Sequence, residues 1–165
     1  MARWIFAVLI GINCDPKPSP SIWVGLSPRR FGILSRVISR KMHQVTLDLP
    51  LGKTAVQAHA TRLELIVTNL LTNSAKYTNP GGRISVVIKI AGNVVTLRVR
   101  DNGMGIASDS LPKIFEPYWK GPASDGLGIG LALVKSLVEL HGGTIAVHSE
   151  GPGLGAEFAV YLPSA

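Results

Sequence analysis

The chain has 165 residues, of which 46% are hydrophobic and 16% are charged, a composition typical of one globular domain rather than of a disordered protein. Its net charge of +7 suits an anionic partner. However, there is no run of five Lys or Arg residues and only 6% of residues are aromatic, which argues against a basic, aromatic-studded nucleic-acid surface. The single cysteine, Cys14, excludes an intrachain disulfide and a Cys/His zinc site, and we expect a reducing cytoplasmic location.

The chain opens with an apolar run of nine residues, Trp4 to Ile12, preceded by Arg3. This run is too short to span a bilayer. It resembles the core of a signal peptide, although no clear small-x-small cleavage site follows it. The alternative is a strand or helix that packs on the domain or on a partner, and membrane contact is the less favoured of the two.

A proline-rich segment, Asp15 to Pro20, has three prolines in six residues and predicts a linker. We therefore divide the chain into an N-terminal apolar segment with its linker, residues 1–25, and one domain, residues 26–165. The domain begins with a short predicted helix within Leu26–Met42, since Ile33, Leu34, Val37 and Ile38 share one side.

The rest of the domain alternates regular helix and strand patterns separated by glycine-rich turns. Predicted strands are Gln44–Leu49, Arg83–Ile90, Val94–Arg100, Thr144–Ser149 and Ala156–Leu162. Predicted helices are Thr61–Tyr77, Ser108–Ile114 and Gly128–Leu140. Ala91-Gly92-Asn93 signals a hairpin between two of the strands. This order favours an α+β fold, a two-layer α/β sandwich with a mixed sheet covered on one face by helices.

Two asparagines interrupt the apolar helix at 61–77. Asn69 and Asn73 are four residues apart, so they stack on one face, and Lys76 falls close to the same line. Amide oxygens at the margin of a cleft can bind a hard cation such as Mg²⁺, and the lysine can pair with phosphate oxygens. Alternatively, the two amides cap loop backbone, and the helix alone does not decide between these readings.

Two glycine-bearing loops follow. Asp101 ends a strand and begins the sequence DNGMGI, in which a carboxylate could accept a hydrogen bond from an exocyclic amine beside closely approaching backbone. A simple turn is the alternative. Gly126-Leu127-Gly128-Ile129-Gly130-Leu131 opens a helix and could offer free N–H groups to phosphates. Its spacing fits neither the Rossmann fingerprint nor a P-loop.

Taken together and in this order, the motifs resemble those of the ATP-binding catalytic domain of sensor histidine kinases. That domain belongs to a wider family shared with type II DNA topoisomerases, Hsp90 chaperones and mismatch-repair ATPases. ELIVTNLLTNSAKYTNPGG resembles the N box, DNGMGI the G1 box and Ile114-Phe115-Glu116-Pro117 the F box. GLGIGLALVKSLVELHGGTIAV resembles the G2 box, and Gly153 to Phe158 the closing G3 signal. The resemblance covers about residues 42–163 and implies the Bergerat ATP-binding fold.

The resemblance also implies roles for individual residues, with ATP and Mg²⁺ as ligands. It makes Asn73 and Lys76 the catalytic residues: Asn73 would hold Mg²⁺ with Asn69 beside it, and Lys76 would reach the phosphates. Asp101 would accept the adenine amine, with Tyr77 nearby. The further nucleotide-binding residues that it implies are Gly103, Gly105, Ile106, Phe115, Lys120, Gly126, Leu127, Gly128, Gly130 and Leu131. Tyr118–Asp125 would form a short lid over the nucleotide, in which Trp119 is expected to pack rather than bind.

One position separates the kinases from the hydrolases of this wider family. The hydrolases have a glutamate one turn before the magnesium asparagine, where it acts as general base for water. This chain has Asn69 there, which cannot accept a proton. The resemblance therefore favours phosphoryl transfer over ATP hydrolysis and weighs against the anti-sigma-factor serine kinases.

A histidine kinase also needs a phosphoacceptor histidine, which the family has on a separate helical hairpin. None of the four histidines, His43, His59, His141 and His148, has the neighbours of that acceptor, and residues 1–42 are too few for the hairpin. A split kinase acting on a separate phosphoacceptor protein, and through it on a response regulator, is the favoured explanation. A fragment, a non-catalytic ATP-dependent binding module and a stand-alone ATPase remain the alternatives.

Overall fold

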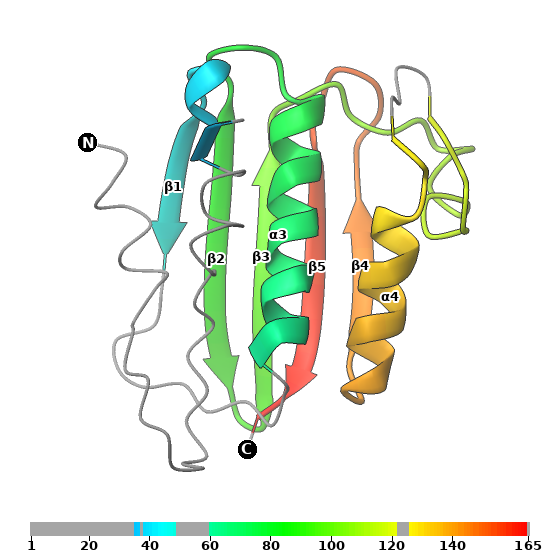
Figure 1. Cartoon of the computed structure of the whole chain (residues 1–165). Coiled ribbons are helices and arrows are strands. Elements are labelled where there is room, and N and C mark those ends of the chain that lie inside the picture. Colours follow the sequence, from blue (N-terminus) through cyan, green and yellow to red (C-terminus); the bar gives the residue numbers. More distant parts are fainter. Residues whose placement is uncertain (1–34, 37, 49–59, 122–125, 165) are drawn as a thin grey trace.

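The computed structural model describes residues 35–36, 38–48, 60–121 and 126–164. They form one five-stranded mixed sheet in the order β1-β2-β3-β5-β4, with both long helices on the same face (Figure 1). The strands are β1 (Gln44–Asp48), β2 (Arg83–Ala91), β3 (Val94–Asp101), β4 (Thr144–His148) and β5 (Ala156–Pro163). The helices are α3 (Ala60–Tyr77) and α4 (Gly130–Leu140). The predicted α+β sandwich is confirmed.

Strand pairing follows the alternation of the sequence. β1 runs parallel to β2, and the pairs β2–β3, β3–β5 and β4–β5 are antiparallel. In β3 every second residue is buried, so one face packs under the helices and the other faces solvent. The predicted hairpin is present, because Ala91 pairs with Val94 and leaves Gly92 and Asn93 as the turn.

The core lies between the sheet and the two helices. The apolar stripe predicted on α3 is buried throughout and consists of Leu63, Ile66, Val67, Leu70 and Leu71. α4 contributes Val134, Leu137 and Val138. Burying each of these side chains stabilises the fold by about 2 kcal/mol. Because the buried faces of α3 and α4 are held against the sheet, the positions of the polar side chains on these helices are fixed as well.

The helix predicted at Ser108–Ile114 is wrong. This segment is a run of turns, with i→i+3 hydrogen bonds such as Ser110 N–H to the Ala107 carbonyl at 2.9 Å. Pro112 explains the difference, because it has no N–H and disfavours helical backbone at the residue before it. The helix predicted from Gly128 begins instead at Gly130, since Gly128 has a left-handed φ of 71°.

Several sequence predictions fall wholly or partly on residues that the structure does not describe. The apolar run at 4–12, the linker at 15–20, His59 and residues 122–125 of the predicted lid lie outside them. Of the helix predicted within 26–42, residues 35–36 and 38–40 are helical. Within the described residues, no helix has both the length and the hydrophobicity needed to cross a bilayer.

The two long helices end in different ways. α4 ends in a Schellman motif, in which the Gly143 N–H donates to the Val138 carbonyl at 3.0 Å and the Gly142 N–H to the Glu139 carbonyl at 2.9 Å. Gly142 has the left-handed φ of 67° that this motif requires. The C-terminal end of α3 has no such local motif, and segments distant in sequence bind its carbonyls.

Candidate functional site

A cavity of about 680 Å³ lies between the C-terminal half of α3, the end of β3 and the segment that leads into α4. Its wall includes most of the residues selected from the sequence: Asn69, Asn73, Lys76, Tyr77, Asp101, Gly105, Ile106, Gly126, Leu127, Gly128, Gly130 and Leu131. Apolar side chains such as Ile114 and Phe158 line the rest. A cavity of this size, mostly apolar with a few convergent polar groups, is typical of a small-molecule site.

α3 supplies the polar side chains along one wall. The Asn69 amide nitrogen Nδ2 donates to the Leu65 carbonyl at 2.8 Å, and this bond fixes how its amide is turned. The amide oxygen Oδ1 then faces the start of α4, since a Cβ atom at Gly130 would lie 3.1 Å from it. One turn further on, Asn73 lines the cavity as well. The helix therefore presents both amide groups to the cavity.

Lys76 lies at the end of the same helix face. Its ammonium nitrogen Nζ is 5.2 Å from the centroid of the Tyr77 ring, a cation–π contact. Nζ would also lie 3.9 Å from a Cβ atom on Gly126, so the charge faces the glycine-rich segment before α4. Ile129, the N-cap residue of α4, makes no side-chain capping bond. The cationic side chain and the uncapped N-terminus together favour an anionic group at this end of the cavity.

Asp101 is the single carboxylate among the described residues of the wall. It is 7% exposed at the end of β3, and its Oδ1 accepts a hydrogen bond from the Gly103 N–H at 3.0 Å. Burial raises the pKa of the Asp101 carboxyl, and the bond from Gly103 opposes part of that rise. Because the folded state holds this proton more tightly than the unfolded chain, ionising Asp101 above its folded-state pKa costs stability. A ligand amine that donates to the carboxylate would offset that cost.

Three residues selected from the sequence lie outside the cavity wall. Gly103 packs against the Tyr77 carbonyl, where a Cβ atom would come within 2.3 Å of the oxygen. Phe115 packs edge-to-face on Phe158, with ring centroids 6.5 Å apart. Lys120 is exposed beside residues 122–125. Trp119 both packs on the core, as expected, and lines the cavity.

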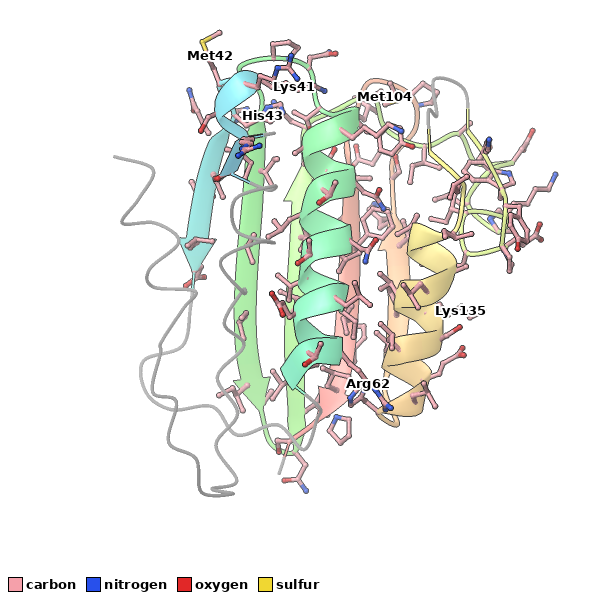
Figure 2. The ribbon with its side chains drawn as sticks, viewed as in Figure 1. Lys41, Met42, His43, Arg62, Met104 and Lys135 are labelled. Atoms are coloured by element: carbon pink, nitrogen blue, oxygen red, sulfur yellow. The ribbon has the colours of Figure 1, made fainter. Side chains whose placement is uncertain are left out.

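The cavity also has wall residues that the sequence reading did not select: Thr72, Ser74, Met104, Ala107, Ser110, Pro152 and Ala156. Figure 2 shows Met104 beside the C-terminal end of α3. Met104 stands inside the quoted DNGMGI motif, so the motif itself was a signal for it. Ala156 stands inside the quoted G3 signal, which was likewise a signal for it, and it pairs with Asp101 across β3 and β5. Pro152 lies in the loop that leads into β5, and no local pattern shows that this loop will reach the cavity.

The donor set limits what the cavity could hold. Among the described residues, no group of three His, Cys, Asp or Glu side chains is placed to hold a metal ion. A cation at this site would depend on amide oxygens and on oxygens of the ligand itself, which suits Mg²⁺ carried by a polyphosphate. A buried carboxylate at one end and an ammonium with amides at the other fit a flat, amine-bearing ring with an anionic tail.

The family model described as "Histidine kinase-, DNA gyrase B-, and HSP90-like ATPase" matches residues 58–165. The alginate biosynthesis sensor protein KinB of Pseudomonas aeruginosa is 39% identical over 123 residues, 73% of this chain and 20% of that protein. The probable sensor histidine kinase TcrY of Mycobacterium tuberculosis is 40% identical over 126 residues, 73% of this chain and 26% of that protein. The chain thus spans about a quarter or less of these relatives.

Solved structures agree in fold. The mycobacterial sensor histidine kinase MprB superposes with a TM-score of 0.72 at 29% identity, covering 82% of this chain and 93% of that structure. Full-length ShkA in complex with AMPPNP superposes with a TM-score of 0.74 at 31% identity, covering 97% of this chain and 34% of that one.

Proposed function

Because this chain belongs to the histidine kinase-, DNA gyrase B- and HSP90-like ATPase family, we propose that it binds Mg-ATP and transfers the γ-phosphoryl group to a histidine of a separate phosphoacceptor protein. The observation that carries the proposal is the composition of the α3 wall, which offers Asn69, Asn73 and Lys76 to the cavity but no carboxylate from that face.

The nucleotide would bind with its adenine near Asp101. The ionised carboxylate would accept a hydrogen bond from the exocyclic amine of adenine. Ile106 and Phe158, on the apolar part of the wall, would contact the faces of the adenine ring. The complex of ShkA with AMPPNP supports nucleotide binding by similarity, since that relative binds an ATP analogue. The amine would add a donor to the carboxylate beside the Gly103 N–H.

The phosphates would lie between Lys76 and the start of α4. Lys76 neutralises charge on their oxygens, and the uncapped N–H groups of α4 donate to them. Asn73, with Asn69 beside it, would hold the cation, and bound Mg²⁺ supplies further charge neutralisation at the phosphates. These residues position the γ-phosphoryl group and stabilise its charge, which is most of what phosphoryl transfer requires of a protein.

The missing base favours transfer to an imidazole rather than to water. Asn69 cannot remove a proton from water, whereas a neutral imidazole nitrogen attacks phosphorus through its own lone pair. The new N–P bond forms as the bond between phosphorus and the β–γ bridging oxygen breaks, and ADP leaves. The sensor protein KinB and the probable sensor histidine kinase TcrY, similar in sequence, support this direction.

The acceptor is proposed to be on another protein. Of the described histidines, His43 is buried with its Nε2 on the Ala75 carbonyl, and His141 is bound through Nδ1 to the Leu137 carbonyl at 2.6 Å. His148 is exposed in β4, on the sheet rather than on a helical hairpin. A phosphorylated acceptor would then pass its phosphoryl group to a response regulator, as in two-component signalling.

A two-stage experiment tests the proposal. AMPPNP binding is first measured by calorimetry with Mg²⁺, and Asp101→Asn should weaken it about 10- to 100-fold, because one hydrogen bond to a charged group is lost. Transfer of label from γ-labelled ATP is then followed on the chain and on a helical-hairpin phosphoacceptor protein from the same organism. Acid-labile label on that second protein only, abolished by Asn73→Ala, is the expected result.

Other outcomes separate the alternatives. Label on this chain would place the acceptor among its own histidines. Phosphate release without a partner, abolished by Asn73→Ala, would identify a stand-alone ATPase and contradict the argument from Asn69. AMPPNP binding without transfer to any hairpin protein of the organism would identify a non-catalytic binding module.

A further inference from the structure

The C-terminal end of α3 bears Lys76 and Tyr77, and its last carbonyls are bound from outside the helix. The Lys41 ammonium Nζ donates to the Lys76 carbonyl at 2.6 Å and to the Thr78 carbonyl at 3.2 Å. His43 Nε2 lies 2.9 Å from the Ala75 carbonyl and must be the donor, since a carbonyl oxygen only accepts. Helix ends leave such carbonyls without partners inside the helix, so these bonds replace the missing ones.

The remaining carbonyl of this turn joins the helix to the loop of Asp101. The Met104 N–H donates to the Tyr77 carbonyl at 3.0 Å. Gly103, which precedes Met104 and donates to the Asp101 carboxylate, packs on the same carbonyl. One helical turn thus contacts the residues before β1 on one side and the loop of the proposed adenine site on the other.

The segment that carries Lys41 and His43 has a fixed shape of its own. The His43 N–H donates to the Ile38 carbonyl at 3.1 Å and the Met42 N–H to the Ser39 carbonyl at 3.2 Å. This is the bond pattern of a Schellman motif, with Met42 in the left-handed position at a φ of 54°. Ile38 is buried in the core, which anchors the motif. The reversal at Met42 turns Lys41 and His43 toward the same helix end.

Figure 2 shows this arrangement. Lys41 and His43 lie at the end of β1 that is next to the C-terminal end of α3, and Arg62 lies at the opposite end of the helix. The positive charge of Lys41 at a helix C-terminus is also favourable with the helix dipole. The Lys41 backbone is held in turn, because its carbonyl accepts from the Gly81 N–H at 2.7 Å.

We propose that Lys41 and His43 are positioning residues for the nucleotide site, acting through the last turn of α3 on the side chains of Lys76 and Tyr77. The inference rests on the proposed function, because the ligand that it concerns is Mg-ATP. Neither residue lines the cavity, so neither touches the ligand. Lys41 and His43 hold the last turn of α3 in place and thereby set where the Lys76 ammonium and the Tyr77 ring lie.

The test compares Lys41→Met with Lys41→Arg and with Arg62→Met as the matched control, since Arg62 is an exposed cation on the far end of the same helix. AMPPNP dissociation constants are measured by calorimetry with Mg²⁺, well below the unfolding midpoint of each variant. Lys41→Met should weaken binding by up to about tenfold, because the energy of one charge-assisted hydrogen bond is the upper limit of what holding the helix end in place can contribute to affinity. Lys41→Arg should restore most of the affinity, and Arg62→Met should leave it unchanged.

Amide hydrogen exchange without nucleotide gives a second readout. Lys41→Met and His43→Leu should accelerate exchange at Thr78, whose N–H closes the last turn on the Ser74 carbonyl at 3.0 Å, while the middle of α3 stays protected. A lower unfolding midpoint with unchanged AMPPNP affinity in Lys41→Met would overturn the inference and leave Lys41 a stabilising residue only. Failure of the wild-type chain to bind AMPPNP would instead overturn the proposed function, and this inference with it.

Discussion

The C-terminal ends of α3 and α4 differ in which residues bind their last carbonyl groups. α4 is capped by its own next residues, with Gly143 returning to the Val138 carbonyl. α3 is capped by Lys41 and His43, which are 35 and 32 residues away from the residues whose carbonyls they bind. The first cap forms whenever the helix forms, whereas the second exists only in the assembled fold. The cavity lies at the end with the remote cap.

This difference has an energetic meaning. A local cap contributes to helix stability alone, so changes to it should leave ligand binding intact. A remote cap connects the helix end to the residues before β1, and the same helix end contacts the loop of Asp101. Substitutions at this end should therefore affect stability and ligand binding together. Three substitutions test this distinction.

Gly103→Ala should have the largest effect. The new Cβ would lie 2.3 Å from the Tyr77 carbonyl oxygen and 2.9 Å from Thr78 Cα, both backbone atoms that cannot move without shifting the end of α3. We expect a loss of about 3 kcal/mol in the free energy of unfolding, measured in urea, together with weaker AMPPNP binding. A variant as stable as the wild type would show that the loop and the helix end are not packed in this way.

Gly142→Ala should have a smaller and separable effect. Its Cβ would meet only Pro163 Cγ at 3.9 Å, so the cost is that of a left-handed alanine, about 1 kcal/mol. AMPPNP affinity should stay within about twofold of the wild type, because distant sites act independently. A large loss of affinity in calorimetry would contradict the separation of the two ends.

Met42→Gly should have the smallest effect and the opposite sign. Met42 is 73% exposed and occupies the left-handed position that Gly142 occupies in the other motif. Glycine removes the cost of a left-handed backbone at a residue with a side chain, but it also adds conformational freedom to the unfolded chain. We therefore expect the free energy of unfolding, measured in urea, to rise by about 0.5 kcal/mol. A clear loss of stability would show that the methionine side chain itself holds the turn.

The two ends also mark what the sequence could and could not predict. The end of α4 was predictable because His141-Gly142-Gly143 is a local signal, as was the turn at Gly92 and Asn93. The cap on α3 was not, since nothing near Lys41 or His43 points to a helix that begins at residue 60. Ser108–Ile114 was predicted as a short helix, but Pro112 removes a backbone donor within it.

The candidate site shows the same division. Asn69, Asn73 and Lys76 were found because helical periodicity places them on one face, and the structure puts all three on the cavity wall. Asp101 was found because it ends a strand before a glycine loop. Pro152 was missed because the sheet order, which no local pattern reveals, brings the loop before β5 to the cavity.

The position of β5 has a consequence for how the molecule is assembled during synthesis. Among the described strands it comes last in sequence, yet it lies between β3 and β4, and β4 pairs only with it. Until residues 156–163 leave the ribosome, β3 has an open edge, and β4 with its helix has no strand to join. The sheet between the wall that bears Asp101 and the wall formed by α4 can therefore close only after β5 is made, and incomplete chains expose apolar surface where the cavity will be.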